Sequence, residues 1–348
     1  MRSFFLKLYK WEFWPFWFFY IPIYFYWMYL SLRAKSCFFF AATNPLMEMG
    51  GFINYSKYNV LKLFPQEFIP KTLFIYKKSQ KENILNLLQK AELNFPLIAK
   101  PDMGERGNRI AKVDNLEELK AYFIEFPKRN ILLQEYIDYP FEYGIMFYRF
   151  SQKEQGTISS MVEKEFLTVC GDGKSTVREL VEADSRRTLY LEHLEEVYKH
   201  KSTLAQIPPK GKIVLLEPIG NHRRGTTFLD ANHKINTDLL RVFDGLSQRL
   251  DGFYFGRYDI KAKSLEDLYA GKNFKIMELN GVNSEPAHIY DPKMPLWKAY
   301  RDLFRHWKNI YKIGTQNHQK GTAYLDFKTG LKHAFAKELI SFVPHYED

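Results

Sequence analysis

Two short runs, separated by one polar connection, constrain what this chain can fold into more than any other part of its sequence. The first, Gly-Arg-Tyr-Asp-Ile-Lys, carries Arg257 and Asp259, and the second, Met-Glu-Leu-Asn, carries Glu278 and Asn280. Residues two apart in a strand point to the same face of a sheet, so each pair shares a face. The glycine-containing segment 262–275 indicates a hairpin-like connection. The sequence therefore predicts two neighbouring strands with all four side chains on one surface.

Three of these side chains supply oxygen atoms. Asp259, Glu278 and Asn280 would form a set that suits Mg²⁺, because this ion takes few protein ligands, keeps several waters and bridges substrate phosphates. The simpler interpretation is a pair of edge strands whose polar residues face water.

The length, composition and net charge of the chain limit the class of protein and its partners. A chain of 348 residues with 46% hydrophobic residues is long enough for two or three subdomains that share cores. A net charge of +10 indicates anionic partners such as nucleotide phosphates or acidic lipids. No recognised nucleic-acid module or stacking platform is present, so nucleic acid is not expected as a partner. Cys37 and Cys170 have no metal-ligand spacing and indicate a reducing compartment without a disulfide framework.

The first 36 residues differ in composition from the rest. The run 13–32 is uncharged and rich in Phe, Trp and Tyr, with basic residues on both sides. Trp and Tyr prefer the headgroup levels but here occupy the whole run, and Pro15 and Pro22 interrupt a helix. We expect a helix broken at Pro22 that lies on the cytoplasmic face of a membrane in a monotopic or re-entrant mode. A full span, and an aromatic core or oligomer interface, are the alternatives.

Three other segments give local predictions. The apolar run 37–42 predicts a buried strand, and 56–64 predicts a helix that carries Lys57 and Lys62. The segment 295–313 predicts a helix with an aromatic stripe and basic residues elsewhere. Its two interpretations are packing on the core and a second membrane contact.

A strand over 95–101 ends in Lys100 and is followed by a turn with Gly104 and Gly107 and then by a further strand. Such a flap lets backbone N–H groups and one lysine close over phosphates, although the glycines alone are also ordinary turn residues. Farther on, Arg224 lies in a basic, glycine-containing loop that is interpreted either as an anion clamp or as surface charge.

In their order and spacing, these runs resemble the ATP-grasp superfamily, nearest to D-alanine–D-alanine ligases and cyanophycin synthetases, over roughly residues 56–292. The resemblance implies an α+β fold in which two α+β subdomains sandwich ATP. The leading domain of the ligases would be truncated here, since only 37–70 separates the aromatic segment from the small subdomain. The implied division is 1–36 for the aromatic membrane-associated segment, 37–70 for the truncated region, 71–140 for the small subdomain, 141–294 for the large subdomain and 295–348 for a helical end.

The resemblance also implies roles for particular residues. Arg257 would be catalytic, with Arg224 as a second arginine, and Asp259, Glu278 and Asn280 would hold the metal. Glu285 and His288 depart from the family pattern, in which small residues are expected; because each lies just past the metal strand and can accept from an ammonium group, we expect one of them to position the incoming amine. The residues implied to hold ATP are Lys57 or Lys62, Lys100, Gly104 and Gly107 of the flap, the hinge residues Gln134, Glu135, Tyr136 and Ile137, and Glu142 at the ribose.

The implied chemistry is attack of a carboxylate on the γ-phosphate of ATP and capture of the acylphosphate by an amine, with two Mg²⁺ ions, or Mn²⁺ in their place. The aromatic segment suggests a lipid-linked or otherwise amphiphilic substrate, and a homodimer is compatible with the sequence. An ATP-grasp phosphotransferase and a non-catalytic nucleotide-binding membrane scaffold are the competing hypotheses.

Overall fold

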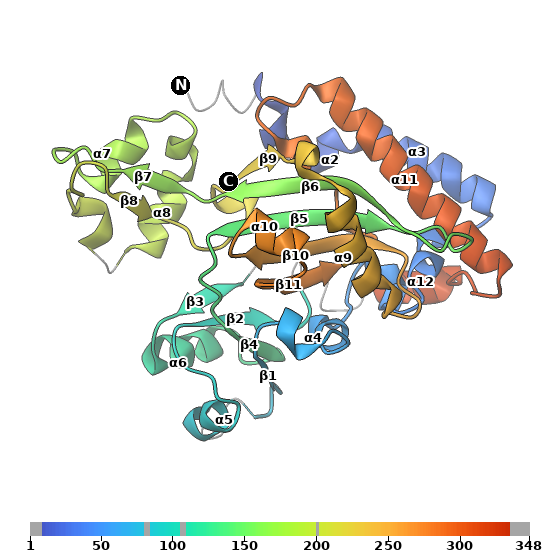
Figure 1. Cartoon of the computed structure of the whole chain (residues 1–348), viewed down its shortest axis with the longest axis horizontal. Coiled ribbons are helices and arrows are strands. Elements are labelled where there is room, and N and C mark those ends of the chain that lie inside the picture. Colours follow the sequence, from blue (N-terminus) through green and yellow to red (C-terminus); the bar gives the residue numbers. More distant parts are fainter. Residues whose placement is uncertain (1–8, 80–83, 105–108, 200–201, 335–348) are drawn as a thin grey trace.

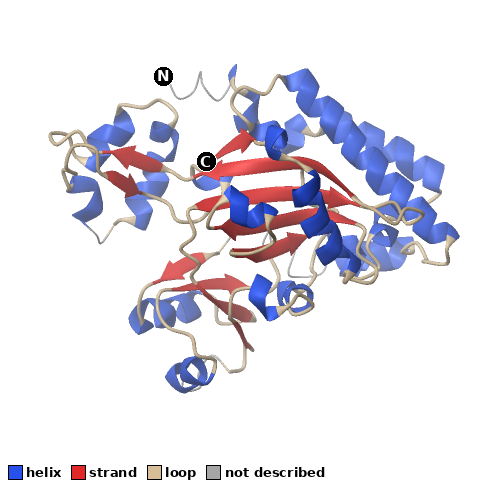
Figure 2. Cartoon of the chain, viewed as in Figure 1, coloured by secondary structure: helices blue, strands red, loops and turns tan. Residues whose placement is uncertain are grey.

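The computed structural model describes residues 9–79, 84–104, 109–199 and 202–334. These residues form a mixed α/β chain with three antiparallel sheets (Figures 1 and 2). A five-stranded sheet lies at the centre, a four-stranded sheet lies below it in Figure 1, and a small two-stranded lobe lies to one side.

The central sheet has the strand order β11-β10-β5-β6-β9. Tyr258, Ile260 and Ala262 of β10 are buried in a core under α9 and α10, and the alternate residues of the strand point to the opposite face. Its elements are β5 (Phe141–Tyr148), β6 (Thr157–Glu165), β9 (Thr227–Asp230), α9 (Thr237–Gln248), β10 (Phe255–Ala262), α10 (Leu265–Tyr269) and β11 (Phe274–Asn280).

The four-stranded sheet has the order β1-β4-β2-β3 and a core of its own beneath α5 and α6. Leu97 and Ala99 of β2 enter that core, which leaves Ile98 and Lys100 on the other face. Its elements are β1 (Thr72–Ile75), α5 (Ile84–Lys90), β2 (Leu97–Pro101), β3 (Ala111–Val113), α6 (Leu116–Glu125) and β4 (Ile131–Glu135).

The side lobe has a separate small core that includes Val169, Val181 and Leu216. It is inserted between β6 and β9 of the central sheet. Its elements are β7 (Thr168–Cys170), α7 (Val177–Glu182), η5 (Arg187–Tyr190), α8 (Leu191–Val197), η6 (Ser202–Ala205) and β8 (Ile213–Leu215).

The N-terminal aromatic segment is folded onto the molecule. It forms η1 (Trp11–Phe13), α2 (Phe16–Phe19) and α3 (Ile21–Ala34), and α3 lies beside α11 (Leu296–Gln319) along one edge (Figure 1). The predicted helix break at Pro22 is wrong in position, because Pro22 lies in the first turn of α3, where a missing N–H costs no helical hydrogen bond. Within the described ranges, we find no helix with the length and apolarity needed to cross a membrane.

The strand predicted over 37–42 is also wrong. The segment forms η2 (Phe39–Thr43), in which the neighbours Phe39 and Phe40 both enter the core shared with α3 and α11. A strand would send neighbouring side chains to opposite faces.

The remaining elements of the described residues are short. Those that follow η2 are η3 (Glu48–Gly51), α4 (Lys57–Leu61) and η4 (Gln66–Phe68). Those later in the chain are η7 (His222–Arg224), η8 (Asn232–Lys234), η9 (Ala287–Tyr290) and α12 (Phe327–Ala334).

Candidate active site

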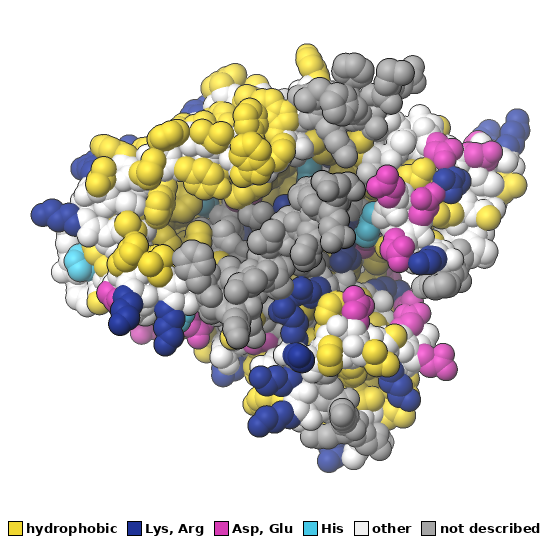
Figure 3. All heavy atoms as spheres, turned by 180° about the vertical axis from the view of Figure 1, so that it is seen from behind, with side chains coloured by type: hydrophobic (Ala, Val, Ile, Leu, Met, Phe, Trp, Pro, Cys, Tyr) yellow, Lys and Arg dark blue, Asp and Glu magenta, His cyan; other side chains and the backbone are white. Residues whose placement is uncertain are grey.

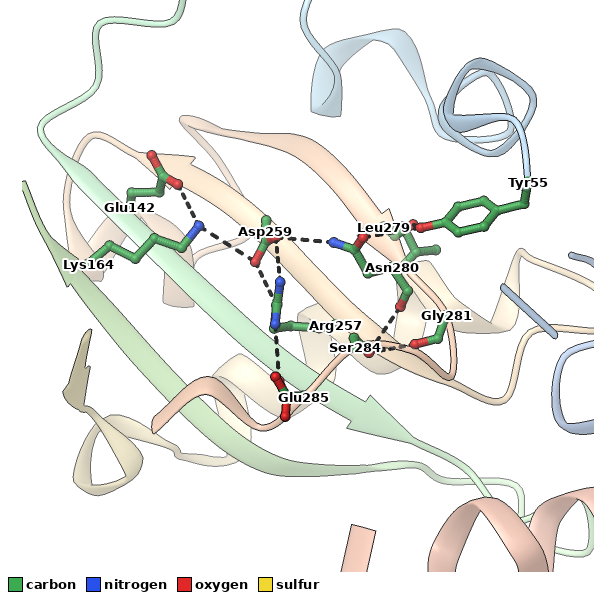
Figure 4. Close-up of polar contacts among 10 residues, drawn as sticks. All are labelled: Tyr55, Glu142, Lys164, Arg257, Asp259, Leu279, Asn280, Gly281, Ser284 and Glu285. Carbon is green, nitrogen blue, oxygen red and sulfur yellow. Dashed lines mark hydrogen bonds and ion pairs between the residues drawn. The ribbon is translucent and has the colours of Figure 1, made fainter. Parts of the chain in front are cut away.

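The predicted pairing of the two polar runs is confirmed. β10 and β11 are antiparallel neighbours, with Arg257 opposite Asn280 and Asp259 opposite Glu278. The connection between them contains the short helix α10 in addition to turns. None of the four side chains belongs to the core of α9, and Figure 4 shows Arg257, Asp259 and Asn280 together on the opposite face of the sheet.

Arg257 and Asp259 form a two-pronged ion pair. Arg257 Nε lies 2.9 Å from Asp259 Oδ1, and its Nη2 lies 3.0 Å from Oδ2. Burial alone would raise the pKa of Asp259, but Arg257 and then Lys164 outweigh this effect and hold the pKa below its usual value. Gly144 of β5 makes room for the pair, because a Cβ there would lie 3.2 Å from Asp259 Oδ1 and 3.3 Å from Arg257 Cδ.

Lys164 is a member of this site that the sequence did not single out. Its Nζ lies 2.7 Å from Glu142 Oε1 and 3.8 Å from Asp259 Oδ1, and the residue is buried. Burial acts to lower its pKa, but Asp259 and Glu142 more than compensate, so the pKa is raised and the lysine is charged. In the sequence Lys164 stands between two glutamates and is typical of a solvated strand face. Only the pairing of β5 with β6 reveals its position.

Glu142, the predicted ribose-binding acid, lies in one row with two lysines. It is opposite Lys164 on one side and opposite Lys261 on the other. Gly220 packs against it, since a Cβ at Gly220 would lie 2.4 Å from Glu142 Oε1. This contact brings the loop that carries Arg224 to the same end of the sheet.

Arg224 belongs to η7, the short helix in that loop. Its Nη1 lies 3.9 Å from Glu217 Oε1, and Glu217 also binds His193 Nε2 at 2.8 Å. In this structure, therefore, Arg224 is part of an ion-pair group at the junction with the side lobe.

Lys100 belongs to the four-stranded sheet and lies across the site from the central sheet. Lys100 Nζ donates to Gln134 Oε1 at 3.0 Å and to the carbonyl of Met277 in β11 at 3.1 Å. The lysine therefore bridges the two sheets. Its burial lowers its pKa to about 8, although Glu278 partly opposes this effect.

Lys57 and Lys62, which the sequence could not separate, occupy different environments. Lys57 is buried, its Nζ lies 3.4 Å from Glu278 Oε1, and it also donates to the carbonyl of Gly104. Lys62 is exposed beside the Tyr58 ring. Lys57 is thus the lysine of α4 that reaches the site.

The position of Lys57 is fixed by the residue that follows β2. Asp102 Oδ1 accepts from Ser56 Oγ at 3.0 Å and from the backbone N–H of Tyr58 at 2.9 Å. Asp102 therefore joins the N-terminus of α4 to the base of the predicted flap. Gly104 is described at that base, whereas Gly107 lies outside the described residues.

The predicted adenine hinge begins in the last two residues of β4 and continues beyond the strand. Gln134 is buried with Lys100, and the backbone N–H of Glu135 donates to the carbonyl of Lys71 at 2.9 Å. Lys261 Nζ donates to the carbonyl of Ile137 at 3.0 Å and lies 5.2 Å from the centre of the Tyr136 ring. Lys261 is therefore the contact from the central sheet that fixes the hinge.

Glu285 is connected to both Arg257 and the N-terminal segment. Arg257 Nη1 donates to the carbonyl of Glu285 at 3.1 Å (Figure 4). The Glu285 carboxylate accepts from the hydroxyls of Tyr20 and of Tyr290, the latter at 3.0 and 3.1 Å. His288, the other predicted amine-binding residue, is buried with its Nε2 3.2 Å from Asp302 Oδ2.

The oxygen donors suit Mg²⁺ by their chemistry. Among the described residues no three His, Cys, Asp or Glu side chains are grouped to hold a metal ion. Asp259, Glu278 and Asn280 supply two carboxylates and an amide. In this structure Asn280 Nδ2 donates to Asp259 Oδ2 at 3.1 Å, and Asn280 Oδ1 accepts from the Tyr55 hydroxyl at 3.1 Å. Mg²⁺ requires few protein ligands beside phosphate oxygens, so these donors fit the ion by their chemistry.

The known proteins that this chain resembles are solved structures with low sequence identity to it. No family model and no curated protein matches the chain. Among solved structures, D-alanine–D-alanine ligase from Bacillus anthracis is similar with a TM-score of 0.42 and 14% identity, over 76% of this chain and 69% of that chain. VanG D-Ala:D-Ser ligase from Enterococcus faecalis gives 0.41 and 15%, over 74% and 61%.

A bifunctional glutathione synthetase from Pasteurella multocida gives a TM-score of 0.37 and 17% identity, over 72% of this chain and 36% of that chain. All three scores lie below 0.5, so these neighbours assign neither an activity nor a site residue to this chain.

Proposed function

We propose that this chain is an ATP-dependent carboxylate–amine ligase of the ATP-grasp type. The observation that carries the proposal is the meeting of Asp259 and Glu278 with three buried lysines, which are Lys164 of the central sheet, Lys100 of the four-stranded sheet and Lys57 of α4. Lysines at such a site neutralise phosphates, and paired carboxylates hold the metal that phosphates require.

The first step is transfer of the γ-phosphoryl group of ATP to the substrate carboxylate. Asp259, Glu278 and Asn280 would hold Mg²⁺, which neutralises the phosphate oxygens when it is bound. Lys57 and Lys100 contact the triphosphate from the side of the four-stranded sheet. An oxygen of the substrate carboxylate attacks the γ-phosphorus, the bond to the bridging oxygen breaks, and ADP leaves with the electron pair. This reaction needs mainly positioning and charge neutralisation.

Arg257 and Glu285 act in the second step. The amine nitrogen attacks the acyl carbon, inorganic phosphate leaves, and the proton of the amine passes to the Glu285 carboxylate. Arg257 donates hydrogen bonds to the oxyanion that forms on the acyl group. Glu285 is favoured over His288 because the His288 ring is buried and already paired with Asp302.

We further propose that the enzyme acts at a membrane surface on an amphiphilic or lipid-linked substrate. The support is the contact between the aromatic segment and the amine-binding residue. Tyr20 donates to the Glu285 carboxylate, and Trp11 Nε1 donates to the carbonyl of Met294 at 3.0 Å, nine residues farther along the same loop. The segment that attracts lipid is therefore also part of the wall of the acceptor site.

Hydroxylamine distinguishes a ligase from a phosphotransferase. The protein would be incubated with MgATP and a panel of carboxylates, with hydroxylamine in place of the amine. We expect hydroxamate to form together with ADP, because an acylphosphate reacts with this nucleophile and a phosphate ester does not. ADP formed with an alcohol acceptor and without hydroxamate would instead support a phosphotransferase and contradict the proposal.

A further inference from the structure

The outer face of α3 is apolar along its whole length. Its inner face packs on α11 through Ile23 and Leu30. The outer residues are large, hydrophobic and exposed, and they recur at the three- and four-residue spacing of one helix face: Ile21, Tyr24, Phe25, Met28, Tyr29 and Leu32. We call this set the outer stripe.

The outer stripe is continuous with further exposed aromatic residues. Trp17 and Phe18 of α2 precede it and are 64% and 45% exposed, and Leu32 at its end is 79% exposed. Figure 3 shows hydrophobic side chains gathered into a broad patch on this side of the molecule, with basic side chains at its margin. Such a patch is larger than the scattered apolar residues of an ordinary surface and marks an interaction site.

A basic pocket lies at the end of the outer stripe. It has a volume of about 440 Å³ and lies between the end of α3 and the second half of α11. Its lining includes Arg33, Lys35, Tyr311, His318 and Tyr324. Arg33 lies over the Tyr29 and Tyr311 rings, with its guanidinium carbon 5.8 and 5.6 Å from their centres. The pocket thus places positive charge directly beside the last apolar residue of the stripe.

Basic residues also follow the neighbouring helix. Arg301, Arg305, Lys308 and Lys312 recur at three- and four-residue spacing on α11 and are exposed. α3 and α11 run in the same direction, because Tyr26 of α3 contacts Phe304 and Arg33 contacts Tyr311 farther along both helices. An apolar stripe with cations at its end and along the adjacent helix matches the boundary between acyl chains and anionic head groups.

We propose that the outer stripe docks into the interface of an anionic membrane and that the pocket at Arg33 and Lys35 binds the phosphate of a phospholipid head group. Since α3 has 14 residues, it is too short to cross a bilayer and lies along the surface. The inference rests on the proposed function for its consequence: docking brings Tyr20, and with it Glu285, to the side from which an amphiphilic substrate arrives.

Vesicle sedimentation tests the docking surface. The protein, residues 1–348, would be centrifuged with vesicles of equal parts phosphatidylglycerol and phosphatidylcholine, and separately with vesicles of phosphatidylcholine alone. We expect the protein to sediment with the anionic vesicles. Phe25→Glu should reduce binding about tenfold or more, because it removes one large apolar side chain from the interface. Ile124→Glu, at a residue 80% exposed on α6, is the matched control and should bind as the wild type does.

The pocket is tested with Arg33→Gln and Lys35→Gln. Each should weaken binding to the anionic vesicles about fivefold, the effect of one cation near an anionic surface, and leave binding to phosphatidylcholine unchanged. All four variants should keep the wild-type thermal shift with MgATP, so a failed membrane inference and a failed nucleotide site give different results.

Three outcomes would overturn the inference. Equal vesicle binding by Phe25→Glu and the wild type would remove the outer stripe from the contact. Stabilisation by glycerol 3-phosphate that depends on Arg33, without vesicle binding, would assign the pocket to soluble phosphate esters. A wild-type dimer that Phe25→Glu dissociates, again without vesicle binding, would make the stripe an interface between two copies of the chain.

Discussion

Lys100 connects protonation to nucleotide binding. Its burial lowers its pKa to about 8, so the free protein loses the charge as the pH rises through this value. Phosphate oxygens favour the charged form, and binding of MgATP should therefore take up a proton at slightly alkaline pH.

We predict that the affinity for MgATP falls as the pH rises above about 8. Titration calorimetry in buffers of different ionisation enthalpy would detect the proton uptake. Lys100→Gln should bind MgATP weakly and without this uptake, and an unchanged uptake in that variant would assign the proton to another group.

Gly144 leaves the space in which the Arg257–Asp259 pair lies. A methyl group there would lie 2.8 Å from Val162 Cγ1 and 3.2 Å from Asp259 Oδ1, so in Gly144→Ala the Val162 side chain must move and the Arg257–Asp259 pair must shift slightly. Overpacking of this kind costs about 1–3 kcal/mol of folding stability. Because the Asp259 carboxylate is shifted, we also expect weaker binding of MgATP in calorimetry. Gly245→Ala is the control, because no atom lies within 4 Å of its added Cβ. Equal affinity for the two variants would show that the pair does not serve the nucleotide.

His306 makes stability depend on pH. Burial, followed by repulsion from Arg257, lowers its pKa to about 3, so the folded chain keeps the ring neutral where the unfolded chain protonates it. The unfolded state then binds the additional proton between about pH 6.5 and 3, and stability falls with falling pH across this range. The slope is about 1.4 kcal/mol per pH unit for one proton.

Urea unfolding at several pH values would measure this slope. His306→Gln should lower this slope by the contribution of one proton, about 1.4 kcal/mol per pH unit. A slope that does not change would mean that the ring is accessible to protons in the folded state.

The segment before α4 is joined to the start of β10 by the hydrogen bonds of one side chain, Asn44. Asn44 Nδ2 donates to the carbonyls of Gly50 and Phe255 at 2.9 and 2.7 Å, and its Oδ1 accepts from the N–H groups of Tyr254 and Phe255, both at 2.9 Å. Gly50 in turn accepts from the N–H of Val282 at 3.1 Å. One buried amide therefore joins the start of β10 to the loop after β11.

We predict that Asn44→Ala lowers the free energy of unfolding by about 2–4 kcal/mol, because four buried partners are left with fewer bonds. Asn44→Asp keeps the two acceptor contacts and should cost less than the alanine variant. Denaturant unfolding gives both values, and a loss below 1 kcal/mol for the alanine variant would show that water replaces the amide.

The local patterns predict some elements and not others, for physical reasons. Alternation in β10 and β11 predicts their pairing because one face is apolar and the other carries charges. The segment 37–42 has no such alternation, and its tertiary packing against α11 selects a 3₁₀ turn. α3 begins at Ile21 and accommodates Pro22 in its first turn, where a proline is tolerated; composition alone does not decide whether a proline starts or breaks a helix.

The site could be predicted only where its residues share a strand or a motif. Arg257, Asp259, Glu278 and Asn280 follow from two adjacent runs. Lys164 and Tyr20 could not be found in this way, because their partners come from β5, β10 and the loop after β11. The choice between Lys57 and Lys62 likewise depends on how Asp102 caps α4.

In the whole molecule, the proposed nucleotide site requires that the two larger sheets face each other across it. Lys100 of the four-stranded sheet already contacts the carbonyl of Met277 in the central sheet, and Lys57 contacts Glu278. MgATP held by both sheets would stabilise their arrangement, because a ligand that binds only the folded state adds to its stability.

Thermal unfolding with and without MgATP tests this claim most directly. The proteins would be the wild type, Asp259→Ala, Glu278→Ala and, as an exposed control, Glu192→Ala. Ligand at about 100 times its Kd adds about 2.7 kcal/mol, so the midpoint should rise by a few degrees in the wild type and the control. The rise should depend on magnesium and be absent in the other two variants. No rise in the folded wild type, or an undiminished rise in both site variants, would contradict the nucleotide site.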